Sequence, residues 1–150
     1  AWNDAQLSDV NRAFLEVLPE QVRRKVGGLK ALLVHGSPAS VDELLGSETP
    51  GSRLAELAKL AEADFVVCGH SHEPFVRRAG KTSFINPGSV GRMFDGDPRA
   101  SFAILKISAG KISVEHFRIP YPVKKVVKSL KKNRLTDIYA KMFQIGKKLN

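Results

Sequence analysis

Hydrophobic residues in the first half of the chain alternate between helical and strand-like spacing. A first helix is predicted to begin at Ser8 or Asp9 and to end before Pro19. Its apolar residues share one face: Val10, Phe14, Val17 and Leu18. Short apolar runs at residues 30–34 and 65–68 predict buried strands, and a helix over 53–63, capped by Ser52, is predicted between them. A helix that joins two apolar strands is typical of a parallel pair.

The segments between these elements are polar. Residues 20–28 are predicted to form a connection. Residues 37–51 contain two prolines and three serines and predict a loop that encloses a short helix over 41–45.

The pattern changes after residue 72 to short strands separated by glycine-containing turns. The predicted strands cover residues 75–77, 83–85, 101–107 and 111–119, and Ala109-Gly110 is a suitable hairpin turn between the last two. Two amphipathic helices follow, each with an apolar stripe that needs a surface to cover. The first stripe is Val123, Val126, Val127 and Leu130, and the second is Leu135, Ile138, Tyr139 and Met142.

Positive charge is concentrated in the last thirty residues. Residues 121–150 contain nine Lys and Arg and a single acid, Asp137, so they carry +8 of the net charge of +9. Such a face can attract nucleic acid or phosphorylated substrates, or it can be the solvated side of packed helices. The segment has no nucleic-acid motif, which favours the solvated face.

Length and composition indicate a single domain over residues 1–150, with 121–150 as a basic helical tail packed on it. No apolar stretch is long enough for a membrane span and no secretory signal pattern is present, so a cytoplasmic location is expected. The single cysteine, Cys68, excludes an internal disulfide. Its place in an apolar strand favours burial over zinc binding.

Three of the four histidines follow predicted strands. His35 comes after the first apolar strand, and His70 and His72 come after the second, beside Gly69. Imidazole at such positions suits metal coordination or proton transfer. The fourth, His116, lies inside a predicted strand without neighbouring ligands and is interpreted as an ordinary strand residue.

Three motifs in order carry a family resemblance: VHGSP at residues 34–38, CGHSH at 68–72 and INPGSVG at 85–91. With them the chain resembles the second half of a calcineurin-like metallophosphoesterase, in particular the small bacterial and archaeal phosphodiesterase branch, over nearly its whole length. The resemblance implies an α/β fold, an α/β/β/α sandwich with two C-terminal helices. It also implies two divalent metal ions, with His35 and His70 on one and His72 on the other. Manganese is the first choice of metal, and nickel, iron, zinc or magnesium are alternatives.

The family's earlier motifs, Asp-x-His, Gly-Asp-x-x-Asp and Gly-Asn-His, do not occur in the chain. We therefore expect an N-terminally incomplete family member. A two-metal site needs bridging carboxylates, so these 150 residues are expected to carry only the histidine half and to be inactive alone. No catalytic residue can be assigned, because the family's candidate general acid belongs to the absent motifs.

Two further residues are candidates for substrate binding. Asn86 lies in an Asn-Pro-Gly-Ser turn that is beside the metals in the family, and the alternative is a purely structural turn. The Arg99 guanidinium can grip a phosphate, and the alternative is a surface ion pair with Asp95 or Asp97. The expected substrate is a phosphate-ester small molecule or a nucleotide. The competing hypothesis is a non-catalytic module whose basic helices bind nucleic acid or a protein partner; the oligomeric state is left open.

Overall fold

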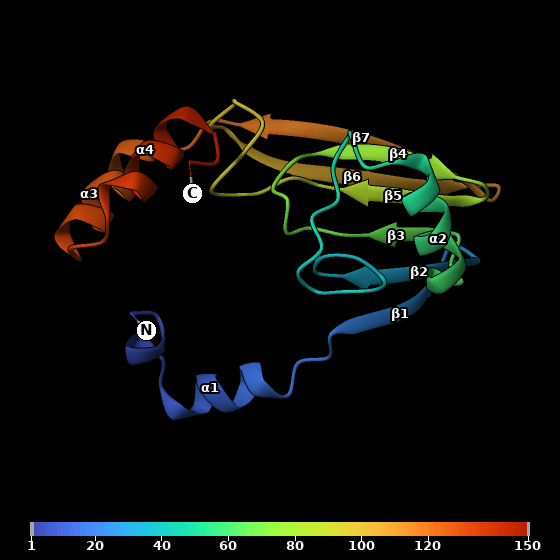
Figure 1. Cartoon of the computed structure of the whole chain (residues 1–150), viewed down its shortest axis with the longest axis horizontal. Coiled ribbons are helices and arrows are strands. Elements are labelled where there is room, and N and C mark those ends of the chain that lie inside the picture. The colour runs from blue at the N-terminus through green and yellow to red at the C-terminus, as the bar shows by residue number, and fades with distance from the viewer. Residues whose placement is uncertain (1, 150) are drawn as a thin grey trace.

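The computed structural model describes residues 2–149, which form two β-sheets and several helices (Figure 1). The helices of the described residues are η1 (Asp4–Gln6, a 3-10 helix), α1 (Asp9–Glu16), α2 (Gly51–Ala61), α3 (Val123–Lys132) and α4 (Asp137–Ile145). The strands are β1 (Gln21–Val26), β2 (Leu29–Val34), β3 (Phe65–Val67), β4 (Phe75–Ala79), β5 (Thr82–Asn86), β6 (Ala100–Ser108) and β7 (Lys111–Ile119).

The larger sheet has five strands in the order β1-β2-β3-β5-β4. Strands β2, β3 and β5 run parallel to one another, and β1 and β4 are antiparallel edge strands. Strands β6 and β7 form a separate antiparallel hairpin. The predicted parallel pair with a helical crossover is confirmed by β2, α2 and β3.

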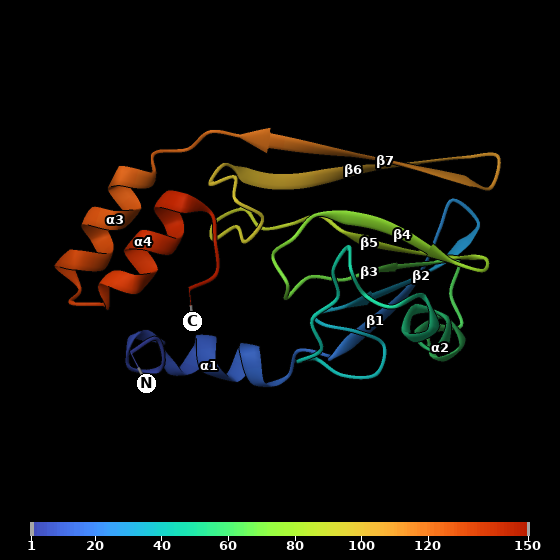
Figure 2. The same ribbon diagram turned by 45° about the horizontal axis from the view of Figure 1, so that its top comes forward.

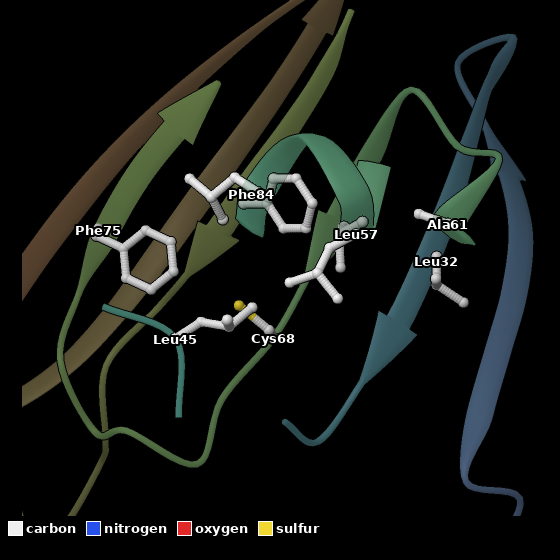
Figure 3. Packing of buried hydrophobic residues seen from close by; sticks show 9 residues of the cluster. Leu32, Leu45, Leu57, Ala61, Cys68, Phe75 and Phe84 are labelled. Carbon is white, nitrogen blue, oxygen red and sulfur yellow. The ribbon is translucent and has the colours of Figure 1, made fainter. Parts of the chain in front are cut away.

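Two apolar clusters cover the two faces of the five-stranded sheet. One packs α2 against the sheet and includes the fully buried Leu32, Leu57 and Phe84 (Figure 3). The other joins the opposite face to apolar residues of the β6-β7 hairpin. The described chain thus stacks as α2, central sheet and hairpin (Figure 2). This agrees with the predicted mixed α/β sandwich. The described residues form three of its layers: α2, the five-stranded sheet and the hairpin.

Cys68 lies in the α2 cluster with an exposure of 2%. Burial raises the pKa of its thiol to about 12, and the sulfur lies 3.6 Å from the Ile85 carbonyl oxygen. The burial expected from the sequence is confirmed.

The two C-terminal helices, α3 and α4, pack on each other beyond one end of the hairpin (Figures 1 and 2). Backbone contacts join the end of α4 to the loop before β6, where the Gly96 amide donates to the Gly146 carbonyl at 2.8 Å. The apolar stripe of α3 is half-buried, and its lysines are exposed. Among residues 2–149, no helix has the length and apolar character needed to cross a membrane.

Helix α1 is capped by Ser8, which accepts a hydrogen bond from the Asn11 amide at 3.3 Å, as the sequence predicts. Its apolar stripe is largely exposed, with Val10 at 79% and Phe14 at 61%. The stripe predicted from periodicity therefore has no covering surface within the described residues.

Three expectations are wrong in detail. Residues 20–28 are not a connection, because β1 pairs with β2 through Gly27 and Gly28, both at positive φ, in a tight hairpin. Residues 41–45 form no helix; the Ser40 hydroxyl accepts a hydrogen bond from the Asp42 amide at 3.2 Å and favours a turn there instead. Helix α2 begins at Gly51 after Pro50 and has no Ser52 cap.

Candidate metal centre

The parallel strands bring the sequence-predicted histidines to one edge of the sheet. His35 follows the carboxyl end of β2, and His70 and His72 follow that of β3. Asn86 closes the neighbouring parallel strand, β5. The Gly69 amide donates to the His35 carbonyl at 2.8 Å and ties the two histidine loops together. Ligand sites of open parallel sheets form at this kind of edge.

His35 and His70 face each other directly. The His35 Nε2 and His70 Nδ1 atoms are 3.0 Å apart, and the ring centroids are separated by 4.8 Å at 58°. Two imidazole nitrogens that bind one ion at about 2.1 Å, at right angles, lie about 3.0 Å apart. The pair therefore fits a shared cation. The same separation also suits a hydrogen bond between the two rings.

His72 is oriented by its other ring nitrogen. Nδ1 donates to the Arg92 carbonyl at 2.5 Å, and the ring stacks on Phe94 with centroids 4.6 Å apart. This hydrogen bond leaves Nε2 as the free acceptor, which is the usual arrangement of a metal-binding histidine. Burial lowers the pKa of His72, an effect that the Arg92 carbonyl opposes and the Arg92 cation reinforces. A lowered pKa keeps the imidazole neutral and able to coordinate.

The backbone is strained at both histidines of the CGHSH motif. His70 has φ of 61° and His72 has φ of 55°, in the left-handed region that favours glycine. Such residues persist where the surrounding structure imposes them, and they concentrate at functional sites.

Asn86 holds the loop that carries His70. It is completely buried; its Nδ2 donates to the Gly69 carbonyl at 2.9 Å and to Ser71 Oγ at 3.0 Å. Its Oδ1 accepts from the Gly88 amide at 2.9 Å. Asn86, a candidate for substrate binding in the sequence, thus uses both its donor and its acceptor in hydrogen bonds within the chain. These bonds suit a residue that orients the loop of a ligand.

The fourth histidine also reaches this turn. His116 Nε2 lies 2.8 Å from the Asn86 carbonyl oxygen. His116 is therefore a hydrogen-bonded strand residue behind the loop.

The loop after His35 is anchored by a polar cluster that no sequence pattern indicates. Glu43 accepts two hydrogen bonds from the Arg53 guanidinium, at 2.8 and 3.0 Å, and a third from the Ser37 hydroxyl. The Arg53 hydrogen bond is the main reason why the pKa of Glu43 is lowered. Because Arg53 belongs to α2, this cluster fixes the His35 loop to that helix.

Arg99 lies with the acids of its own loop and not with the histidines. Its guanidinium pairs with Asp97 at 2.6 Å, and this hydrogen bonding lowers the pKa of Asp97 to about 2. This is the ion pair that the sequence offered as the alternative. The second acid, Asp95, pairs with Arg118.

Within residues 2–149, no three His, Cys, Asp or Glu side chains come together in a group that could hold a metal ion. The described donors are thus one imidazole pair and one separate imidazole, and all three assignments as ligands stay predictions.

The sequence and fold match known proteins. A family model described as the calcineurin-like phosphoesterase superfamily domain matches residues 3–110. An uncharacterized protein of Methanocaldococcus jannaschii is 27% identical and covers 97% of this chain. A probable metallophosphoesterase of Methanothermobacter thermautotrophicus is 29% identical over 56% of the chain. The chain spans 64% and 62% of the lengths of these two relatives.

Two solved structures share the fold over 97% of the chain. A metallophosphoesterase from Sphaerobacter thermophilus superposes with a TM-score of 0.83 at 23% identity, and 64% of its length is covered. A hypothetical protein from Pyrococcus horikoshii superposes with a TM-score of 0.84 at 22% identity, and 57% of its length is covered. These structures share the fold, and the family model over most of its residues shows that the chain belongs to the calcineurin-like phosphoesterase superfamily.

Proposed function

We propose that this chain is the histidine half of a two-metal phosphoesterase that hydrolyses phosphate esters. The observation that carries the proposal is the 3.0 Å separation of His35 Nε2 and His70 Nδ1 at the carboxyl ends of parallel strands. Family membership supports a phosphoesterase activity in general.

His35 and His70 would hold one cation, and His72 would present Nε2 to the other. When bound, two such cations supply Lewis-acid stabilisation of the charge that develops on the phosphoryl oxygens. Imidazole ligands favour manganese, nickel, iron or zinc, with manganese our first choice and magnesium the remaining alternative. The chain's own contribution is orientation: the Arg92 carbonyl fixes the His72 tautomer, and Asn86 fixes the His70 loop.

The carboxylates that such a site needs would lie outside these 150 residues, since no three His, Cys, Asp or Glu side chains of residues 2–149 form a group that could hold a metal ion. We therefore expect the isolated 150-residue chain to be inactive or very weak. A full-length protein, meaning this chain preceded by the family's earlier motifs, would contain the complete site.

The test compares the turnover of bis(4-nitrophenyl) phosphate with Mn²⁺ by the full-length protein and by the isolated 150-residue chain. We expect turnover by the full-length protein, a loss of at least 100-fold in His70→Ala, and little change in His116→Gln, which keeps a donor toward the Asn86 carbonyl. Inactivity of the full-length protein with each of the five metals, or equal turnover by His70→Ala, would contradict the proposal. Strong metal-dependent turnover by the isolated chain would contradict its division into halves.

A further inference from the structure

We propose that the Arg92 guanidinium binds the phosphate of the substrate. The aromatic cavity beside it would bind the nucleoside group of a nucleotide ester. This inference rests on the proposed phosphoesterase function and names its substrate class. It concerns a residue and a cavity that the resemblance did not assign.

The first observation is the surroundings of the Arg92 guanidinium. Its central carbon lies 5.4 Å from the Phe94 ring centroid and 5.3 Å from that of Tyr139. None of the ion pairs between residues 2 and 149 includes Arg92, whereas the neighbouring Arg99 and Arg118 each pair with an acid. Contact with rings orients a guanidinium and leaves its edge free to donate paired hydrogen bonds to a phosphate.

The second observation is the position of Arg92 relative to the histidines. Its backbone carbonyl accepts the His72 hydrogen bond, and Phe94 stacks on the His72 ring. The same loop therefore orients a candidate ligand and carries a cation that forms no ion pair among the described residues. A phosphate beside His72 would gain a charge-assisted hydrogen bond from this side chain, which is among the stronger kinds in proteins.

The third observation is a cavity of about 540 Å³ that Arg92 lines together with Trp2, Tyr139 and Phe143. Leu130 and Leu135 complete its apolar wall. This volume lies in the range of small-molecule sites. Aromatic side chains of this kind stack on the flat faces of nucleobases.

Charge favours the same class of ligand. The cavity wall belongs in part to α3 and α4, and the segment that contains these helices carries +8 of the net charge. A basic surface next to a phosphate-binding residue raises the local concentration of anionic substrates. The cavity, the unpaired arginine and the basic helices together favour a nucleotide over a small alkyl phosphate.

The kinetic test uses the full-length protein with Mn²⁺ and two substrates that share a leaving group and a charge. They are thymidine 5′-(4-nitrophenyl) phosphate and ethyl 4-nitrophenyl phosphate. We expect kcat/KM to be about ten-fold higher for the thymidine ester. Tyr139→Leu and Phe143→Leu should each lower kcat/KM more for the thymidine ester than for the ethyl ester and so remove most of this preference.

Arg92→Gln keeps the backbone carbonyl that orients His72. It should lower kcat/KM for both esters by about 10- to 100-fold, mainly through KM, as the loss of one hydrogen bond to a charged group implies. Arg92→Lys should recover part of the loss. The matched control is Arg78→Gln, which removes the same charge from β4, where Arg78 Nε donates to Gly80 in the β4-β5 turn.

Metal-free calorimetric titration with thymidine 5′-phosphate separates this inference from the proposed function. We expect binding that weakens at least ten-fold in Arg92→Gln and in Tyr139→Leu but not in Arg78→Gln. Such binding without turnover would support the nucleotide site and refute the phosphoesterase. Absence of binding, equal kcat/KM for the two esters, or Arg92→Gln indistinguishable from Arg78→Gln would overturn the inference.

Discussion

Replacement of Asn86 by alanine should destabilise the protein and loosen the His70 loop at the same time. The side chain is completely buried and makes three hydrogen bonds, to the Gly69 carbonyl, to Ser71 Oγ and from the Gly88 amide. Each is worth about 1 kcal/mol net, and a buried partner left without one costs about 1–3 kcal/mol. We therefore expect a loss of about 3–5 kcal/mol, a large part of the 5–15 kcal/mol typical of a domain.

The assay is urea unfolding of the full-length protein, with Mn²⁺ affinity measured by calorimetry on the same variants. Asn86→Asp keeps the shape but places an acceptor against the Gly69 carbonyl, and it should lose stability as well. The matched control is Asn133→Ala, because the Asn133 side chain is exposed and donates to the Ser129 carbonyl at the end of α3; a change within about 0.5 kcal/mol is expected. Loss of a residue that orients ligands should weaken metal binding about 10- to 100-fold. A loss of stability below about 1 kcal/mol, or unchanged Mn²⁺ affinity, would refute the reasoning.

Three further predictions follow from the strained loop, the buried thiol and the Glu43 cluster. His70→Gly should be about 1 kcal/mol more stable than His70→Ala in urea unfolding, since φ of 61° penalises alanine; equal stability would show that the loop relaxes. Cys68 should react with an aromatic disulfide reagent only at the rate of unfolding, because its pKa is raised to about 12 and it is buried; labelling within minutes in native buffer would contradict this. Glu43→Gln should cost about 1 kcal/mol at pH 7 through the loss of the paired Arg53 hydrogen bonds. Because the pKa of Glu43 lies below its ordinary 4.5, that contribution is present above pH 4.5 and is lost as the pH falls through the lowered pKa, so the deficit should vanish in acid; a deficit that persists there would exclude the carboxylate as its cause.

The elements with strong periodicity could be predicted from the sequence. The apolar runs before His35 and Gly69 and the helix between them specify parallel strands, and this topology alone explains why the histidine loops meet. Strand β1 has no apolar alternation that could predict it, because its residues are nearly all exposed and it is held by backbone pairing to β2. The Gly27-Gly28 pair was the available signal.

The parts of the site that depend on tertiary contacts could not be predicted. The Arg92 carbonyl that orients His72 is a backbone atom twenty residues away, and sequence spacing gives no indication of such a partner. The contact between the Arg92 side chain and Tyr139 of α4 joins two distant parts of the sequence, so spacing along the chain does not indicate it. Glu43 and Arg53 are two charged residues among many in the sequence. They pair because the fold places the loop that carries Glu43 against α2, which carries Arg53.

The central claim is that His35 and His70 share one cation while His72 faces another. Crystals of the full-length protein soaked in Mn²⁺ would test it through anomalous scattering from the metal. We predict two peaks about 3.5–4 Å apart, one within about 2.3 Å of His35 Nε2 and His70 Nδ1 and the other equally close to His72 Nε2. Peaks elsewhere, or a single peak that none of these nitrogens contacts, would contradict the account.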